Sequence, residues 1–115
     1  MISDSLSQTL FALADPTRRA ILARLTRGQA SVAQLAQPFN IGVRAVSKHI
    51  GVLERAGLVS RERDAQRRPS RIQFAPLQAV DDWLGTYRRL WEGRFDNIAD
   101  VLSRIKKGEL DDPRD

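Results

Sequence analysis

The chain contains no cysteine among its 115 residues. This absence excludes disulfides, thiolate metal sites and thiol redox chemistry, and it suits a reducing cytoplasm. No stretch approaches the roughly 20 apolar residues that a membrane-spanning helix needs. The N-terminal residues include Asp4 and have no basic segment ahead of an apolar run, unlike a signal peptide. We therefore expect a cytoplasmic protein with no membrane partner.

Patterns of catalysis and metal binding are also missing from the sequence. The one histidine, His49, has no nucleophile and orienting acid that can be assigned beside it. Phosphate-cradling glycine loops and paired catalytic carboxylates are not found either. The acidic residues of the C-terminal part have no histidine among them, a poor composition for a transition-metal site. We expect neither an enzyme nor a bound metal or cofactor.

Positive charge is concentrated in one segment of the chain. The formal net charge is +5, and the segment from Arg44 to Arg71 holds eight basic and three acidic residues. Eight minus three is five, so this segment alone carries a net positive charge equal to that of the whole chain. A local basic field favours a polyanion such as nucleic acid or anionic lipid. A solvated face that only keeps the protein soluble is the alternative.

Helical patterns fill the N-terminal part of the chain. Apolar residues at helical spacing, beginning with Leu6 and Leu10, predict an amphipathic first helix. Asp15 and Pro16 are typical of a helix start, because aspartate caps the free N–H groups and proline fits the first turn. They predict a second helix over residues 17–26.

Two further helices follow, joined by a turn. Ser31 and Gln34 have the spacing of a capping box and predict the start of a short helix. A turn over residues 38–42 then leads to a helix over residues 43–56, which ends where Gly57 suits a left-handed backbone. This last helix has one narrow apolar edge, made of Val46, Ile50 and Leu53. Two short helices joined by such a turn form a helix-turn-helix.

A hairpin and a long helix complete the chain. Strands are predicted over residues 58–63 and 71–74, joined by a loop that runs to Ser70, and a helix over residues 77–107. The predicted fold is mainly α with a small β-hairpin, a winged helix-turn-helix with long N- and C-terminal dimerisation helices. We expect a single domain over residues 1–108 and an acidic, disordered tail over residues 109–115.

Four blocks of the sequence resemble the ArsR, or arsenical-resistance-repressor, family of bacterial winged-helix regulators. They are ALADPTRRAILARL (12–25), SVAQLA (31–36), AVSKHIGVLERAGLV (45–59) and YRRLWEGRFDNI (87–98). In particular, these blocks are similar to the small, metal-free, autorepressor-type branch of the family. Metal-sensing relatives carry cysteine pairs or Asp/His ligand sets, which this chain lacks. The resemblance implies a homodimer that represses transcription from an operator near its own promoter. Gly42 departs from the family pattern, in which a capping serine or threonine is more common.

The outward face of the helix over residues 43–56 is predicted to read DNA. Val43, Arg44, Ser47 and Lys48 lie on or beside the face opposite the apolar edge, and the resemblance assigns operator contacts to the same positions. An α-helix with such a face fits the major groove. His49 lies beside the apolar edge. A phosphate contact, an inter-helix hydrogen bond and plain packing are all open for it.

The predicted wing, residues 58–74, adds further arginines. We expect DNA contacts from Arg63, Arg67, Arg68 and Arg71. Strand arginines can contact the backbone beside a recognition helix, and a basic tip can enter the minor groove. The family usually has a glycine in the wing turn, whereas this chain has Ala65 and Gln66 there.

The long helix is predicted to form a dimer. Its apolar stripe is longer than a small domain can cover with its own core. Large aromatic side chains on such a stripe are favoured interface anchors. The predicted dimer contacts are Leu6, Leu10, Trp83, Tyr87, Leu90, Trp91, Phe95, Ile98 and Leu102.

These patterns predict a sequence-specific transcriptional regulator. The expected partner is a double-stranded DNA operator with an inverted repeat, bound by a homodimeric repressor through the helix over residues 43–56 and the wing. The alternative is a winged-helix protein-interaction module whose long C-terminal helix docks a partner chain. A small-molecule inducer is compatible with the sequence, which does not identify one.

Overall fold

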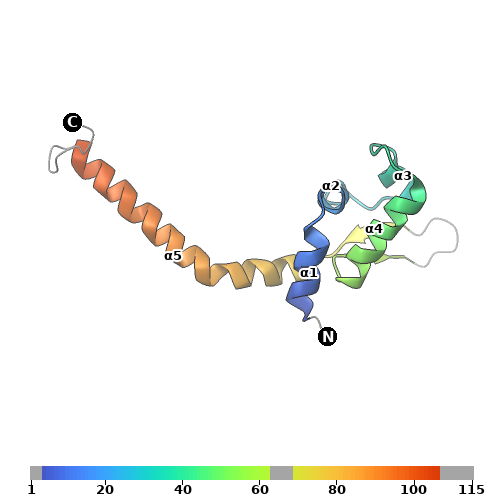
Figure 1. Ribbon diagram of the computed structural model, residues 1–115, viewed down its shortest axis with the longest axis horizontal. Coiled ribbons are helices and arrows are strands. Elements are labelled where there is room, and N and C mark those ends of the chain that lie inside the picture. Colours follow the sequence, from blue (N-terminus) through green and yellow to red (C-terminus); the bar gives the residue numbers. More distant parts are fainter. Residues whose placement is uncertain (1–3, 63–68, 107–115) are drawn as a thin grey trace. The chain divides into compact units, whose positions relative to one another are not determined.

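The computed structural model describes residues 4–62 and 69–106, apart from the side chains of Phe95 and Asp96. Five helices and one antiparallel hairpin are described in this part of the chain (Figure 1). The elements are α1 (Ser5–Leu13), α2 (Pro16–Leu25), α3 (Val32–Ala36), α4 (Val43–Arg55), β1 (Val59–Arg61), β2 (Ser70–Ile72) and α5 (Ala75–Lys106). The predicted fold class, mainly α with a small hairpin in winged helix-turn-helix order, is confirmed.

The chain falls into two units, one up to Val80 and one from Asp81, and each is described by itself. The prediction of a single domain over residues 1–108 stays a prediction. The tail over residues 109–115 lies outside the described residues. Among the described residues, no helix combines the length and the apolar character needed to cross a membrane.

The predicted helix starts are confirmed by their capping hydrogen bonds. The main-chain N–H of Arg18 donates to Asp15 Oδ2 at 3.0 Å, which satisfies a free donor in the first turn of α2. At α3, Gln34 N donates to Ser31 Oγ at 3.2 Å, and Ser31 N donates to Gln34 Oε1 at 2.8 Å. These reciprocal bonds are a capping box. Local sequence therefore sets where α2 and α3 begin.

The helix α4 has the predicted buried edge and the predicted end. Val46, Ile50 and Leu53 are fully buried. Gly57 follows the helix with φ of 76°, a left-handed conformation that favours glycine. Gly42 is the N-cap and provides no side-chain cap, so α4 begins without the hydrogen bond that serine would add.

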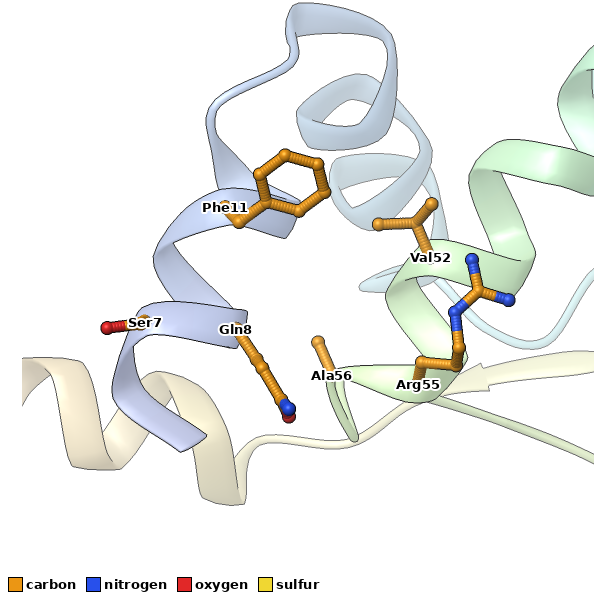
Figure 2. A pocket seen from close by; sticks show the side chains of 6 residues that line it. All are labelled: Ser7, Gln8, Phe11, Val52, Arg55 and Ala56. Atoms are coloured by element: carbon orange, nitrogen blue, oxygen red, sulfur yellow. The ribbon is translucent and has the colours of Figure 1, made fainter. Parts of the chain in front are cut away.

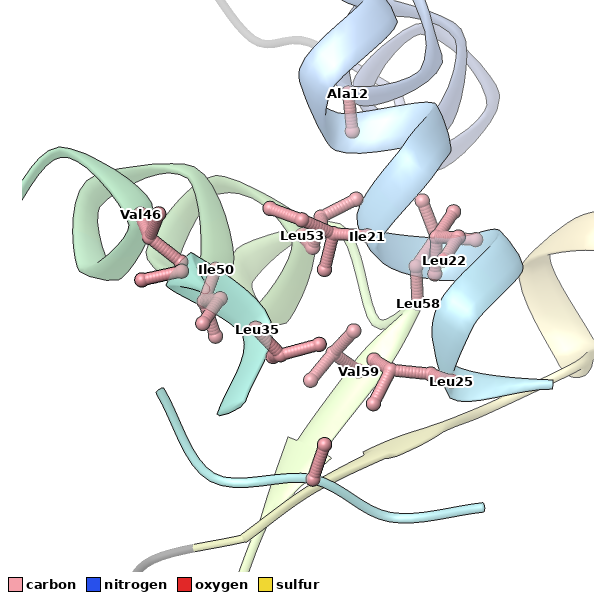
Figure 3. Packing of buried hydrophobic residues seen from close by; sticks show 12 residues of the cluster. Ala12, Ile21, Leu22, Leu25, Leu35, Val46, Ile50, Leu53, Leu58 and Val59 are labelled. Carbon is pink, nitrogen blue, oxygen red and sulfur yellow. The ribbon is translucent and has the colours of Figure 1, made fainter. Parts of the chain in front are cut away.

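One hydrophobic core joins the first four helices to the hairpin (Figure 3). Its largest fully buried members come from α2, α3, α4 and the start of the hairpin, and they are Ile21, Leu25, Leu35, Val46, Ile50, Leu53 and Leu58. Burying each such side chain contributes about 1.5–3 kcal/mol to folding. The core therefore fixes α4 by its inner edge and leaves the opposite face in solvent.

The hairpin is shorter than predicted and has an additional partner. Val59 pairs with Ile72 and Arg61 pairs with Ser70 in an antiparallel register. The expectation that Ser70 belongs to the loop is wrong, because Ser70 and Ala30 also exchange main-chain hydrogen bonds of 2.8 and 3.1 Å. The bridge fixes the second strand to the segment between α2 and α3, and the strand begins at Ser70.

The helix α5 begins two residues earlier than predicted. Pro76 lies in its first turn, where a missing N–H removes no helical hydrogen bond. Pro76 therefore belongs to the helix, which was predicted to begin one residue after it. The helix continues to Lys106, the last residue that the structure describes.

Candidate nucleic-acid interface

The predicted reading residues of α4 share one open face. Val43 is 53% exposed, Arg44 and Lys48 are exposed, and Ser47 is half-buried. They line an open depression of about 790 Å³, whose full lining is Val43, Arg44, Ser47, Lys48, Gly51, Val52, Glu54, Arg55 and Arg61. Four of these side chains are basic and one is acidic. The structure thus brings the four predicted α4 residues together on a positively charged surface.

Arg61 connects the hairpin to α4. Its Nη2 donates a hydrogen bond to the main-chain oxygen of Ser47 at 3.2 Å. Because Arg61 lies in β1 and Ser47 in the N-terminal half of α4, this bond sets the strand against the helix. From the sequence, Arg61 is one of several arginines in the wing. Its hydrogen bond to Ser47, 14 positions away, could not be predicted from a local pattern.

Arg71 is held by two neighbours. Its Nη2 lies 2.7 Å from Glu62 Oε1, and its Nε donates to Gln29 Oε1 at 2.8 Å. The ion pair is exposed and contributes little to stability, but it orients the guanidinium. The DNA contact of Arg71 stays a prediction. Arg63, Arg67 and Arg68 lie outside the described residues.

His49 lies at the junction of α2 and α4. Its Nδ1 is 3.4 Å from Arg18 Nη1 and 3.9 Å from Asp15 Oδ2. Because arginine can only donate, Nδ1 accepts in this hydrogen bond when the ring proton is on Nε2. The inter-helix hydrogen bond is therefore the arrangement found among the three alternatives, and the predicted DNA contact stays a prediction.

Arg18 is the residue that sequence reasoning missed. It is only 9% exposed, and its Nε donates to Ala12 O at 2.7 Å while Nη2 donates to Phe11 O at 3.0 Å. These bonds satisfy free carbonyls at the end of α1. The guanidinium also lies 5.3 Å from the centre of the Phe11 ring, within cation–π range. Arg18 therefore joins α1, α2 and, through His49, the helix α4.

The same junction lowers the pKa of Asp15. The largest cause is the hydrogen bond from the main-chain N–H of Arg18, and the nearby His49 and Arg18 side chains act in the same direction. Partial burial of the carboxyl opposes them. The Asp15 cap is consequently strongest in its charged form.

The predicted dimer residues are mostly exposed in the single chain. In the unit from Asp81, Leu90 is 67% exposed, and Trp83, Tyr87, Trp91, Ile98 and Leu102 are exposed as well. The Trp83 and Tyr87 rings pack edge to face with centroids 5.6 Å apart. In α1, Leu10 is exposed and Leu6 is half-buried. The Phe95 side chain lies outside the described part, and contact with a second copy stays a prediction.

Known proteins show the same organisation. A family model for a helix-turn-helix domain matches residues 13–62, which contain α2, α3, α4 and β1. The transcriptional repressor SdpR of Bacillus subtilis (strain 168) is 33% identical over 73 residues, covering 64% of this chain and 81% of its own. A crystallised ArsR family transcriptional regulator is 42% identical with a TM-score of 0.72, covering 77% of this chain and 98% of its own.

A third relative is known in solution. It is the homodimeric winged helix-turn-helix DNA-binding domain of Mb0332 from Mycobacterium bovis, a possible ArsR-family transcriptional regulator. Its structure is 29% identical to this chain with a TM-score of 0.58, covering 69% of this chain and 80% of its own.

Proposed function

Because this chain belongs to the ArsR family of transcriptional regulators, we propose that it is a homodimeric repressor of an inverted-repeat operator near its own promoter. The observation that supports this most is the shared open face of Val43, Arg44, Ser47 and Lys48, opposite a fully buried edge. Such a role needs access to chromosomal DNA in the cytoplasm and involves no catalytic step.

The side chains on this face have the chemistry for reading base pairs. The Arg44 guanidinium can donate two hydrogen bonds to guanine O6 and N7 in the major groove. Ser47 can donate or accept, and Val43 can contact a thymine methyl group. Lys48 suits a phosphate, which adds affinity without sequence preference. We expect the N-terminal half of α4 to carry the specificity.

Two copies would place two recognition helices on one duplex. The Mb0332 domain is homodimeric in solution, and the exposed apolar side chains of α5 are available for such an interface in this chain. A two-fold dimer would bind half-sites about 34–36 Å apart, in successive major grooves.

Leu90→Glu tests the dimer. We expect the solution mass to fall from twice 13.0 kDa to 13.0 kDa, because a charge replaces an exposed apolar contact. Phe74→Glu is the matched control, because Phe74 is also exposed but lies outside the proposed interface. A wild-type protein of 13.0 kDa at all working concentrations would contradict the proposal.

Operator binding is tested with the DNA upstream of the protein's own coding region and a scrambled duplex of equal length. The repressor should bind the upstream DNA more tightly. If the dimer neutralises about eight phosphates, log K falls with log salt at a slope of about −7. Equal affinity for the two duplexes would contradict the proposal and favour a protein-interaction module.

A further inference from the structure

A cavity of about 400 Å³ opens between α1 and the C-terminal end of α4 (Figure 2). It is lined by Ser7, Gln8, Phe11, Val52, Arg55 and Ala56. All six belong to the unit up to Val80, so the cavity lies within one unit. Its volume is in the range of about 300–1,000 Å³ that is typical of small-molecule sites.

The lining combines an apolar wall with a single positive charge. Phe11 faces Val52 across the opening, and Ala56 lies below them (Figure 2). Phe11 is 64% exposed, a large apolar surface left to water although Arg18 lies near the ring. A flat apolar group seated between Phe11 and Val52 would remove this surface from water.

Arg55 gives the cavity its charge preference. Its guanidinium forms no ion pair within the described part of the chain, and no acidic side chain among those residues lines the cavity. The Gln8 side chain extends into the opening from α1 and offers an amide to a polar headgroup (Figure 2). The planar guanidinium matches the geometry of a carboxylate and can hold it through two hydrogen bonds.

From this combination we infer that the cavity binds a small amphipathic monocarboxylate. The aromatic or branched apolar body of the ligand packs between Phe11 and Val52, and its carboxylate pairs with Arg55. A second copy of the chain covering the same surface is the competing occupant, and the experiment below separates the two.

Arg55 also links the cavity to the proposed DNA-binding face. It lines both this cavity and the depression that contains Arg44 and Lys48. Gly51 lies one turn before it, and a Cβ there would be in ordinary contact with Arg55 Nη1 at 3.6 Å, so the guanidinium lies along α4 beside Gly51. A bound carboxylate would draw this charge away from DNA. The ligand therefore acts as an inducer that lowers operator affinity, a step that rests on the proposed function.

Binding is tested without DNA, by following the methyl NMR signals of Val52 and Ala56 during titration with phenylacetate. We expect saturable shifts with a dissociation constant of about 1 mM. The neutral analogue 2-phenylacetamide should bind about fivefold more weakly, and Arg55→Gln should weaken phenylacetate by a similar factor. Gln8→Trp should abolish the shifts, because the indole fills the opening from an exposed position of α1.

Arg27→Gln is the matched control for the loss of one charge, because Arg27 is exposed and lies away from the cavity. It should leave phenylacetate binding unchanged. Equal binding of acid and amide, shifts confined to other methyl groups, or an absence of saturable shifts would overturn the inference. The inference would also be overturned if the Val52 and Ala56 methyl signals shifted on dimerisation alone, before any ligand is added. That result would assign the cavity to a second copy of the chain.

Coupling to DNA is a separate measurement. Saturating phenylacetate should lower the affinity of the wild type for the upstream DNA by about the same factor as the Arg55→Gln substitution does without ligand. In the Arg55→Gln variant, phenylacetate should leave the affinity for this DNA unchanged. If phenylacetate binds at Val52 but operator affinity does not change, the inducer role fails while the site stands. If the upstream DNA is not preferred at all, the proposed function fails, and the NMR result still decides the site.

Discussion

Arg61 Nη2 donates a hydrogen bond to the main-chain oxygen of Ser47, across 3.2 Å between β1 and α4. The acceptor is a main-chain atom, so the bond does not depend on the side chain that α4 presents at position 47. The donor is a charged group, which makes such a bond stronger than a neutral one. The bond therefore adds a polar contact to the hydrophobic core that already holds the hairpin against the recognition helix.

Replacing Arg61 with methionine should weaken DNA binding without unfolding the protein. Methionine keeps the length of the side chain but removes both the charge and the bond to Ser47. Because the dimer loses one charge from each copy, we expect the salt slope of DNA binding to fall by about two, together with a lower affinity for every sequence. Arg27→Met is the matched control and should bind like the wild type. Titrations at several salt concentrations check this, and an unchanged slope in Arg61→Met would refute it.

The double substitution Arg44→Ala and Lys48→Ala should abolish the preference for the upstream DNA. Loss of the Arg44 fork removes about 1–3 kcal/mol of discrimination between bases, and loss of Lys48 weakens all duplexes alike. Both side chains are exposed, so the free energy of unfolding should change by no more than about 0.5 kcal/mol. Competition binding with scrambled DNA measures the preference. A double variant that still distinguishes the two duplexes would show that other residues read the bases.

Arg18→Ala should destabilise the fold by about 2–4 kcal/mol. The buried guanidinium satisfies two carbonyl oxygens at the end of α1, and its removal leaves Ala12 O without that partner. Arg19 supplies the matched control, because it also donates to an α1 carbonyl, Leu13 O at 2.7 Å, but from an exposed position. Arg19→Ala should cost no more than about 0.5 kcal/mol. Urea unfolding compares the two, and equal effects would mean that burial of Arg18 adds nothing.

Stability should decrease in acid through the Asp15 cap. Folding lowers the pKa of Asp15, so its contribution is complete above the unfolded pKa of about 4 and is lost as pH falls through the lower folded value. Asp15→Asn keeps an acceptor for the Arg18 N–H but does not titrate. Between about pH 5 and about pH 3, the free energy of unfolding of this variant should therefore fall less than that of the wild type. Urea unfolding over this range decides it, and parallel curves for both proteins would contradict the assignment.

Features that depend on neighbouring residues could be predicted from the sequence. The Ser31 and Gln34 capping box, the Asp15 cap and the left-handed Gly57 each involve residues within a few positions, so their chemistry is visible in the pattern. The buried edge of α4 follows in the same way from helical spacing. These local signals were sufficient to place α4 and the residues on its outer face.

Features that join distant parts of the chain could not be predicted. The bridge between Ala30 and Ser70 and the contact between Arg18 and His49 connect segments 40 and 31 positions apart, and no periodicity marks them. The bridge is the reason that the second strand begins earlier than its own residues suggest. Of the candidate site, the α4 residues were found together, whereas the pairing of Arg71 with Glu62 and Gln29 emerged only from the fold.

The central claim is that two copies of α4 bind one duplex at a fixed separation. Hydroxyl-radical footprinting of the wild-type protein on the DNA upstream of its own coding region tests it most directly. We expect two protected stretches with related sequences, centred about 10–10.5 base pairs or a multiple of that spacing apart. A single protected stretch with no second half-site, or even protection along the whole duplex, would contradict it.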